Sequence, residues 1–252
     1  MNIQKDSRMD NSKIGWTHHT WNPWWGCNKV SAACQFCYIG QIMRRSGNEP
    51  FHGPKRTKTT WKTPFTWNRK AEKTGQRLRI FTCSMSDFFH PSADAWRPEA
   101  WEIIRECDQL DWLILTKRPE LIADRLPSDW GRGYPNVWLG VTIEDQSLLS
   151  RLEHLAKIPA AIRFVSAEPL LGPVRFGRLI RKIDWVITGC EDAAKGKRRE
   201  MNLDWVRSIR DECDKAGVAL FHKQYYTGTT IVYDGLIDGA VRQSWPRSLS
   251  AR

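Results

Sequence analysis

Three cysteines stand close together near the start of the chain, in the stretch WNPWWGCNKVSAACQFCY. Cys27, Cys34 and Cys37 have the spacing C-x6-C-x2-C, and the other four cysteines are dispersed. Thiolates are soft ligands that suit zinc and iron–sulfur clusters. A structural zinc usually takes four ligands, often from two C-x2-C pairs, and one such pair is present here. Three local thiolates without a fourth favour a [4Fe–4S] cluster in which one iron is open to an external ligand.

Short apolar runs recur along the chain and predict the strands that position these cysteines. The runs are rich in Val, Ile, Leu, Phe and Trp, and polar residues follow each one. Strands that are buried on both faces of a parallel sheet have this nearly continuous hydrophobicity. The runs lie at 78–83, 111–116, 136–142, 162–167, 184–190 and 218–223, and an earlier strand is expected over 13–21.

Helical patterns lie between several of these runs, at 98–110, 147–157 and 203–217. For the last helix, Asn202 is a suitable N-cap and Gly217 a suitable stop. Strands that alternate with helices indicate βαβ units and a mostly parallel sheet. We therefore predict an α/β fold, a full or partial parallel (β/α) barrel with six to seven β/α units. A doubly wound open sheet is the alternative.

The length of 252 residues suits one such domain, expected over 13–252 after a flexible tail at 1–12. The segment 44–77 is basic and has no long apolar run, so it is either a substrate-facing insertion or a solvated connection of loop and helix. No apolar run approaches the roughly 18 residues that span a bilayer, and the polar N-terminus does not resemble a signal peptide. We expect a cytoplasmic protein that does not contact a membrane.

The charge balance predicts an anionic partner. The formal net charge is +11, which attracts nucleic acids, nucleotides or phosphorylated substrates. Some of the fourteen tryptophans could be stacking platforms for bases. A basic enzyme whose charge serves solubility is the alternative. Seven cysteines, an odd number, do not favour a disulfide framework in a cytoplasmic protein.

Polar residues follow nearly every predicted strand. In parallel α/β folds the carboxyl ends of the strands meet at one edge and form the site, where the cysteine loop would open too. Each charged residue at this edge could instead form a salt bridge or a solvated rim. The residues expected there are Cys83, Ser84, Ser86, Asp87, His90, Lys117, Arg118, Glu144, Asp145, Gln146, Glu168, Cys190, Glu191, Asp192, His222, Lys223 and Gln224.

The cysteine loop resembles that of radical S-adenosylmethionine (SAM) enzymes. In those enzymes three cysteines after the first barrel strand hold a [4Fe–4S] cluster, and SAM binds the open iron. Their common spacing is C-x3-C-x2-C, with an aromatic residue before the last cysteine. Cys34 to Cys37 matches the second half, Phe36 included, but the first gap has six residues instead of three. The resemblance implies that Cys27, Cys34 and Cys37 are ligands and that Phe36 lies beside the adenine, with Tyr38 as a further cofactor-binding candidate.

A wider resemblance is to the phage Gp37/Gp68 family, also described as a three-Cys-motif, radical-SAM-like family. It runs from about Ile14 to Tyr226 and is carried by GWTHHTWNPWWGC, FCY, PFHGP, SMSDFFHP, LTKRPE, NVWLGVTIEDQ, PAAIRFVSAEPLLGP and HKQYY. The segment GCED at 189–192 departs from the GGES expected there. The resemblance implies the cluster and SAM and leaves the substrate open.

The resemblance implies an enzyme that cleaves SAM reductively and takes a hydrogen atom from its substrate with a 5′-deoxyadenosyl radical. The electron donor would be a protein such as flavodoxin or ferredoxin, and the substrate an anion such as DNA, RNA or a nucleotide. Besides Phe36 and Tyr38, the cofactor-binding candidates are Ser84, Ser86, Asp87, Glu144 and Glu191. The catalytic candidates are Lys117, Glu168 and Lys223, with Cys83 and Cys190 as donors of a hydrogen atom or, alternatively, small buried thiols.

A non-catalytic, zinc-stabilised nucleic-acid-binding protein is the alternative from another class. It would use the same three cysteines and a fourth ligand, namely His18, His19 or Cys83. The two histidines could instead be ordinary strand residues. Cys107 and Cys213 fall inside predicted helices and are expected to be packing residues.

Overall fold

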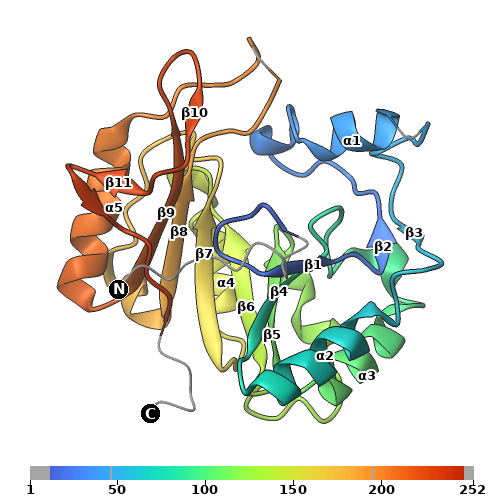
Figure 1. Ribbon diagram of the computed structural model, residues 1–252. Coiled ribbons are helices and arrows are strands. Elements are labelled where there is room, and N and C mark those ends of the chain that lie inside the picture. Colours follow the sequence, from blue (N-terminus) through green and yellow to red (C-terminus); the bar gives the residue numbers. More distant parts are fainter. Residues whose placement is uncertain (1–11, 46, 195, 247–252) are drawn as a thin grey trace.

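An eight-stranded sheet forms the centre of the computed structural model, which describes residues 12–45, 47–194 and 196–246 (Figure 1). Its strand order is β1-β4-β5-β6-β7-β8-β9-β10. Each neighbouring pair from β1 to β9 is parallel, and β10 runs antiparallel to β9. The strands are β1 (His19–Trp21), β4 (Leu78–Thr82), β5 (Leu110–Thr116), β6 (Val137–Thr142), β7 (Ile162–Ala167), β8 (Trp185–Gly189), β9 (Ala219–Tyr226) and β10 (Ile231–Val232).

Helices and short hairpins surround this sheet. The α-helices are α1 (Ile39–Arg45), α2 (Thr63–Thr74), α3 (Arg97–Glu106), α4 (Ser150–Leu155) and α5 (Leu203–Ala216). Short 3-10 helices are η1 (Ala32–Cys34), η2 (Pro91–Ala93), η3 (Pro119–Leu121), η4 (Ala123–Arg125), η5 (Gln146–Leu148) and η6 (Gly177–Lys182). Two further two-stranded ladders pair β2 (Trp24–Trp25) with β3 (Lys55–Arg56) and β11 (Leu236–Ile237) with β12 (Ala240–Val241).

The predicted α/β class and parallel sheet are confirmed, and the doubly wound alternative is wrong. In a doubly wound sheet the strand order reverses at a switch point, whereas here the parallel strands are neighbours in their chain order. Among the described residues, no ladder joins β1 to β9 or β10, so hydrogen bonds do not close the sheet into a full barrel.

The sheet nevertheless curves, as shown by one side chain before β1 that contacts two strands far apart in the strand order. The ring of Trp16 lies 4.7 Å from that of Phe81 on β4 and 6.1 Å from that of Trp185 on β8, although three strands separate these two. Trp185 also contacts Trp138 and Phe221 through edge-on ring pairs. This aromatic cluster occupies the inner face of the curved sheet, mostly along the N-terminal half of its strands.

Strand residues alternate between this inner cluster and a second, outer one. On β5, Leu113 belongs to the inner cluster, whereas Trp112 and Ile114 belong to the outer core beneath the helices. Burial on both faces explains why the strand sequences are almost continuously apolar. On β6, Gly140 leaves space for the ring of Phe164, since a Cβ at this glycine would lie 2.4 Å from that ring.

Several predicted boundaries hold, and others shift. Helix α5 is capped as expected, since the Asn202 side chain accepts the N–H of Asp204 at 2.8 Å and Gly217 ends the helix with φ 69°. The strand expected over 13–21 is shortened to β1, because Trp16 turns into the inner cluster.

The basic segment 44–77 contains α2, which packs against β4 and β5 as the helix of a β/α unit. Most of the expected N-terminal tail, residues 1–11, lies outside the described residues. In the described part of the chain, every helix is too short or too polar to cross a membrane.

Candidate functional site

A cavity of about 430 Å³ lies at the carboxyl ends of the strands, beneath the cysteine loop. It contains most of the strand-end residues that the sequence predicts. The lining residues include Cys27, Cys34, Phe36, Cys37, Tyr38, Cys83, Ser84, Ser86, Asp87, Lys117, Arg118, Glu168, Cys190, Glu191 and Lys223. Five of the seven cysteines therefore open on one space, and all seven are free thiols.

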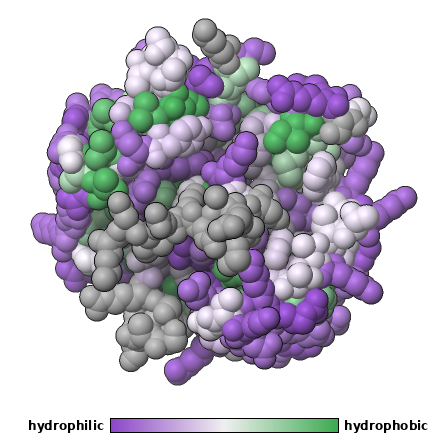
Figure 2. Space-filling model, in the orientation of Figure 1, coloured by the Kyte–Doolittle hydropathy of each residue, from purple (hydrophilic) through white to green (hydrophobic). Residues whose placement is uncertain are grey.

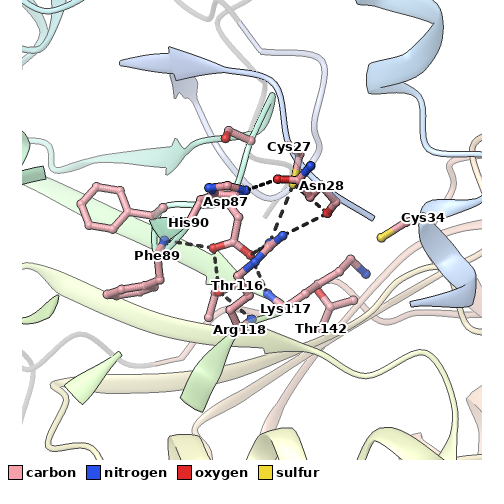
Figure 3. Close-up of polar contacts among 12 residues, drawn as sticks. Cys27, Asn28, Cys34, Asp87, Phe89, His90, Thr116, Lys117, Arg118 and Thr142 are labelled. Carbon is pink, nitrogen blue, oxygen red and sulfur yellow. Dashed lines mark hydrogen bonds and ion pairs between the residues drawn. The ribbon is translucent and has the colours of Figure 1, made fainter. Parts of the chain in front are cut away.

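The start of the cysteine loop is held by a buried ion pair (Figure 3). Arg118, after β5, donates to Asp87 at 3.0 Å, to the backbone oxygen of Asn28 at 3.0 Å and to the sulfur of Cys27 at 3.8 Å. Asp87, after β4, also accepts from the hydroxyl of Thr116 and from the backbone N–H of Lys117. Asp87 thus positions Arg118, and Arg118 positions the first cysteine.

The middle of the loop is held by Glu144, which follows β6. Its carboxylate accepts from the hydroxyl of Ser31 at 2.9 Å, forms an ion pair with Arg151 at 2.9 Å and a second pair with Lys117. Glu144 is 1% exposed. Although predicted at this edge, Glu144 does not line the cavity, and its partners connect the loop to β5 and β6.

The end of the loop is held by Arg199, which sequence reasoning did not single out. Arg199 pairs with Glu191, donates to the backbone oxygen of Ala32 at 3.2 Å and lies 5.3 Å above the ring of Phe36. Glu191 follows β8, so this contact joins the loop to the far side of the sheet. Nothing in the basic run KGKRRE distinguishes Arg199 from its neighbours, because its role depends on a partner 167 residues away.

The remaining predicted charges of the cavity also pair with each other. Lys223 on β9 donates to Glu168 after β7 at 2.8 Å, and both are largely buried. Ser86 donates to the backbone oxygen of Gly26 at 2.5 Å, and the Tyr38 hydroxyl donates to that of Ser84. The polar wall is therefore largely self-satisfied.

Cys83 stands out by its backbone, which has φ 61°. This left-handed conformation is uncommon for a residue other than glycine and costs on the order of 1 kcal/mol or more. It is held by a hydrogen bond from the Cys83 N–H to the backbone oxygen of Trp21 at 2.8 Å. His90, by contrast, does not line the cavity and bonds to the Asn28 side chain at 2.6 Å.

The cavity thiols differ in whether their surroundings raise or lower the pKa. Burial, assisted by the Asp87 carboxylate, raises the pKa of Cys27 to about 11, against the opposing effect of Arg118. Burial likewise raises the pKa of Cys37 and of Cys190, the latter to about 11. At Cys34 burial opposes the thiolate, but a backbone hydrogen bond at Val30 and the Lys117 ammonium outweigh it and lower the pKa. Cys34 is thus the thiol of the loop that ionises most readily.

The donor set of the loop fits an iron–sulfur cluster, whereas the side chains are not gathered around a common point. Cys27, Cys34 and Cys37 are unpaired thiols on one loop over one cavity, which is the soft sulfur set that such a cluster requires. In the described parts of the chain, no three His, Cys, Asp or Glu side chains are grouped as ligands for a metal ion. Figure 3 accordingly shows Cys34 apart from Cys27.

Neither histidine proposed as a zinc ligand lines this cavity. The ring of His19 stacks on that of Trp67 in α2, with centroids 4.5 Å apart. Nδ1 of His18 accepts the backbone N–H of Arg79 at 2.8 Å. His19 lies in β1 and His18 directly precedes this strand. Of the three candidates for a fourth ligand, Cys83 alone lines the cavity.

The fold and the site define an α/β protein with a cysteine-lined cavity at the carboxyl edge of a curved parallel sheet. The chain belongs to the family described as "Protein of unknown function (DUF5131)", whose profile matches residues 11–234. No curated protein sequence matches the chain. Among solved structures, a cysteine-to-serine mutant of spore photoproduct lyase is similar at 13% identity and a TM-score of 0.49, covering 92% of this chain and 72% of that one.

Proposed function

We propose that the protein is a radical SAM enzyme in which Cys27, Cys34 and Cys37 hold a [4Fe–4S] cluster. One observation carries this proposal: three local, unpaired thiols open on the same cavity as the ends of six parallel strands. The resemblance of the loop to the radical SAM cysteine motif supports it. Binding would require the three side chains to turn toward one another.

The residues around the cavity suit this task. When bound, the cluster and SAM supply a 5′-deoxyadenosyl radical that removes a hydrogen atom from a substrate. Arg118, Glu144 and Arg199 hold the loop over the strand ends. Phe36 and Tyr38 offer aromatic surface to an adenine, and the apolar floor excludes water from the reacting atoms.

The finer parts of the proposal concern partners. The phage Gp37/Gp68 resemblance remains a prediction. An anionic substrate, a one-electron donor such as flavodoxin or ferredoxin, and a cytoplasmic setting complete the hypothesis. The roles of Ser84, Ser86, Asp87, Glu144 and Glu191 toward SAM, and of Lys117, Glu168 and Lys223 toward the substrate, remain predictions.

Metal analysis of anaerobically purified protein tests the proposal. We expect a brown protein with about four irons and matching sulfide. Each of the changes Cys27→Ala, Cys34→Ala and Cys37→Ala should remove most of that iron. The matched control is Cys213→Ala, which removes a buried thiol of α5 outside the cavity and should leave the iron content unchanged.

Activity is measured by adding dithionite and SAM to the reconstituted protein and following 5′-deoxyadenosine. Cleavage in the wild type and its loss in the three loop variants are expected. A colourless protein with a single zinc, bound through the same cysteines, would establish the non-catalytic alternative instead. Cys83→Ala and Cys190→Ala should keep the cluster; loss of product with retained SAM cleavage in either would identify a hydrogen-atom donor.

A further inference from the structure

Cations lie on three segments that also supply residues to the cavity wall, and all of these cations are exposed except the half-buried Arg198. They are Lys29 in the cysteine loop, Arg44 and Arg45 at the end of α1, and Lys197 and Arg198 in the loop after β8. We call these five residues the mouth cations. Figure 1 shows α1 and the loop after β8 in the upper part of the view, and Arg199 ties this loop to the cysteine loop. Within the described residues, none of the five forms an ion pair with a carboxylate.

The charges inside the cavity are balanced in a way that those at its mouth are not. Arg118 pairs with Asp87, and Lys223 pairs with Glu168. The carboxylates of Glu144 and Glu191 are paired as well. Lys13 and Asp192, both exposed, line the cavity outside these pairs, and the mouth cations add unpaired positive charge around it. This arrangement suits an extended anion that crosses the opening better than a compact anion held at the bottom.

Apolar and aromatic surface alternates with these cations. Val30 and Ile42 line the cavity and are 44% and 40% exposed. Nζ of Lys29 lies 4.8 Å from the centre of the Phe51 ring, and the Arg198 guanidinium lies 5.4 Å from that of Tyr226. Figure 2 shows apolar patches scattered among hydrophilic residues on the face that is turned to the viewer. Alternating positive charge and apolar surface matches the alternating phosphates and bases of a nucleic acid strand.

We propose that the mouth cations bind the phosphates of a nucleic acid strand, so that one nucleotide is presented to the cysteine-lined cavity. The inference rests on the proposed function, because it assigns a substrate class to the same cavity. Enzymes that modify a base inside a larger polymer must bring that base out of its stack and into a pocket. Phosphate contacts outside and a charge-balanced, partly apolar pocket inside suit that arrangement.

Fluorescence anisotropy of the full chain with labelled oligonucleotides tests this inference across a range of salt concentrations. The test variant combines Lys29→Gln, Arg44→Gln and Arg45→Gln. The matched control combines Arg178→Gln, Arg181→Gln and Lys182→Gln, which removes three exposed cations from η6, just before β8 and hence toward the opposite edge of the sheet. Single-stranded DNA, single-stranded RNA and duplex DNA of one sequence are compared, and the form that binds most tightly identifies the natural source.

The wild type should bind with a steep salt dependence. The loss of three phosphate contacts should make the slope of log K, the association constant, against log salt less negative. We expect a change of about 2 for single strands and about 2.7 for duplex DNA. The η6 control should keep the wild-type slope. The inference is overturned if the wild type does not bind, if both triple variants lose the same slope, or if polyglutamate of equal charge competes as well as the oligonucleotide.

The binding assay needs neither SAM nor reductant, so it separates this inference from the proposed function. An iron-free protein that binds nucleic acid through the mouth cations would reject the radical chemistry alone. A cluster-loaded protein that cleaves SAM but fails to bind would reject the nucleic acid inference alone. Iron content of the mouth variant, expected to equal that of the wild type, shows that its fold and cofactor site are intact.

Discussion

The inner face of the sheet carries different kinds of side chains at the two ends of its parallel strands. At the N-terminal end the inner face is a dry cluster of rings that includes Trp138, Phe164, Trp185 and Phe221. At the carboxyl end the same face carries ion pairs, such as that of Glu168 with Lys223. The cysteine loop lies over this end of the sheet. The first region is stabilised by close packing and apolar burial, and the second by specific ion pairs and hydrogen bonds.

The change from aromatic to charged side chains takes only a few residues along a strand. On β7 the inner face changes from Phe164 through Ser166 to Glu168, and on β9 it changes directly from Phe221 to Lys223. Inner positions recur every second residue, so a short step along the strand moves a side chain from the floor to the cavity. This division lets the floor carry stability while the mouth carries chemistry, and substitutions at the two ends should therefore fail in different ways.

The largest expected effect is at the floor. Trp185→Ala removes a fully buried ring that contacts four other aromatic rings and donates from its indole N–H to Ser244 at 2.8 Å. We expect the free energy of unfolding to fall by about 3–5 kcal/mol. Urea denaturation measures this loss. Trp205→Ala, at a half-buried position on α5, should cost clearly less; equal costs would show that the floor is not a special centre of stability.

The second largest effect on stability is expected at the carboxyl end of the strands, under the cysteine loop. Glu144→Ala leaves the buried Arg151 and the partly buried Lys117 without their carboxylate and frees Ser31. Breaking such a buried pair should lower the free energy of unfolding by about 3 kcal/mol. Unlike the floor variant, it should also raise hydrogen exchange selectively in residues 27–37.

The control for this variant is Glu144→Gln, which retains an acceptor for Ser31 but no charge. It should restore part of the protection of residues 27–37 without restoring the ion pairs. If the alanine variant exchanges like the wild type in this segment, Glu144 stabilises the sheet but does not position the cysteine loop.

The smallest effect on stability is expected at the edge of the mouth. Arg199→Gln removes a partly exposed ion pair with Glu191, so the free energy of unfolding should change by less than about 1 kcal/mol. Hydrogen exchange should nevertheless increase near Ala32 and Phe36, which Arg199 contacts. Arg207→Gln removes a comparable exposed pair on α5 and should leave that segment unaffected. Matching exchange in the two variants would contradict a tie between Arg199 and the loop.

Much of the fold could be predicted because its signals are local. Helix α5 shows a cap, an apolar stripe and a glycine stop within one stretch of sequence, and the structure has it at the expected place. The strand ends likewise supplied most of the cavity wall. The shortening of β1 could not be predicted, because Trp16 leaves the strand to join rings from β4 and β8.

The sequence by itself determined the alternation of strands and helices, the grouping of three thiols on one loop and the excess of positive charge, since each is a property of neighbouring residues. Only the tertiary structure decided that the sheet curves without closing and that Arg118, Glu144 and Arg199 hold the cysteine loop in place. These contacts join groups that are tens to more than a hundred residues apart in the chain. Their geometry depends on packing of the whole sheet, which no local pattern encodes.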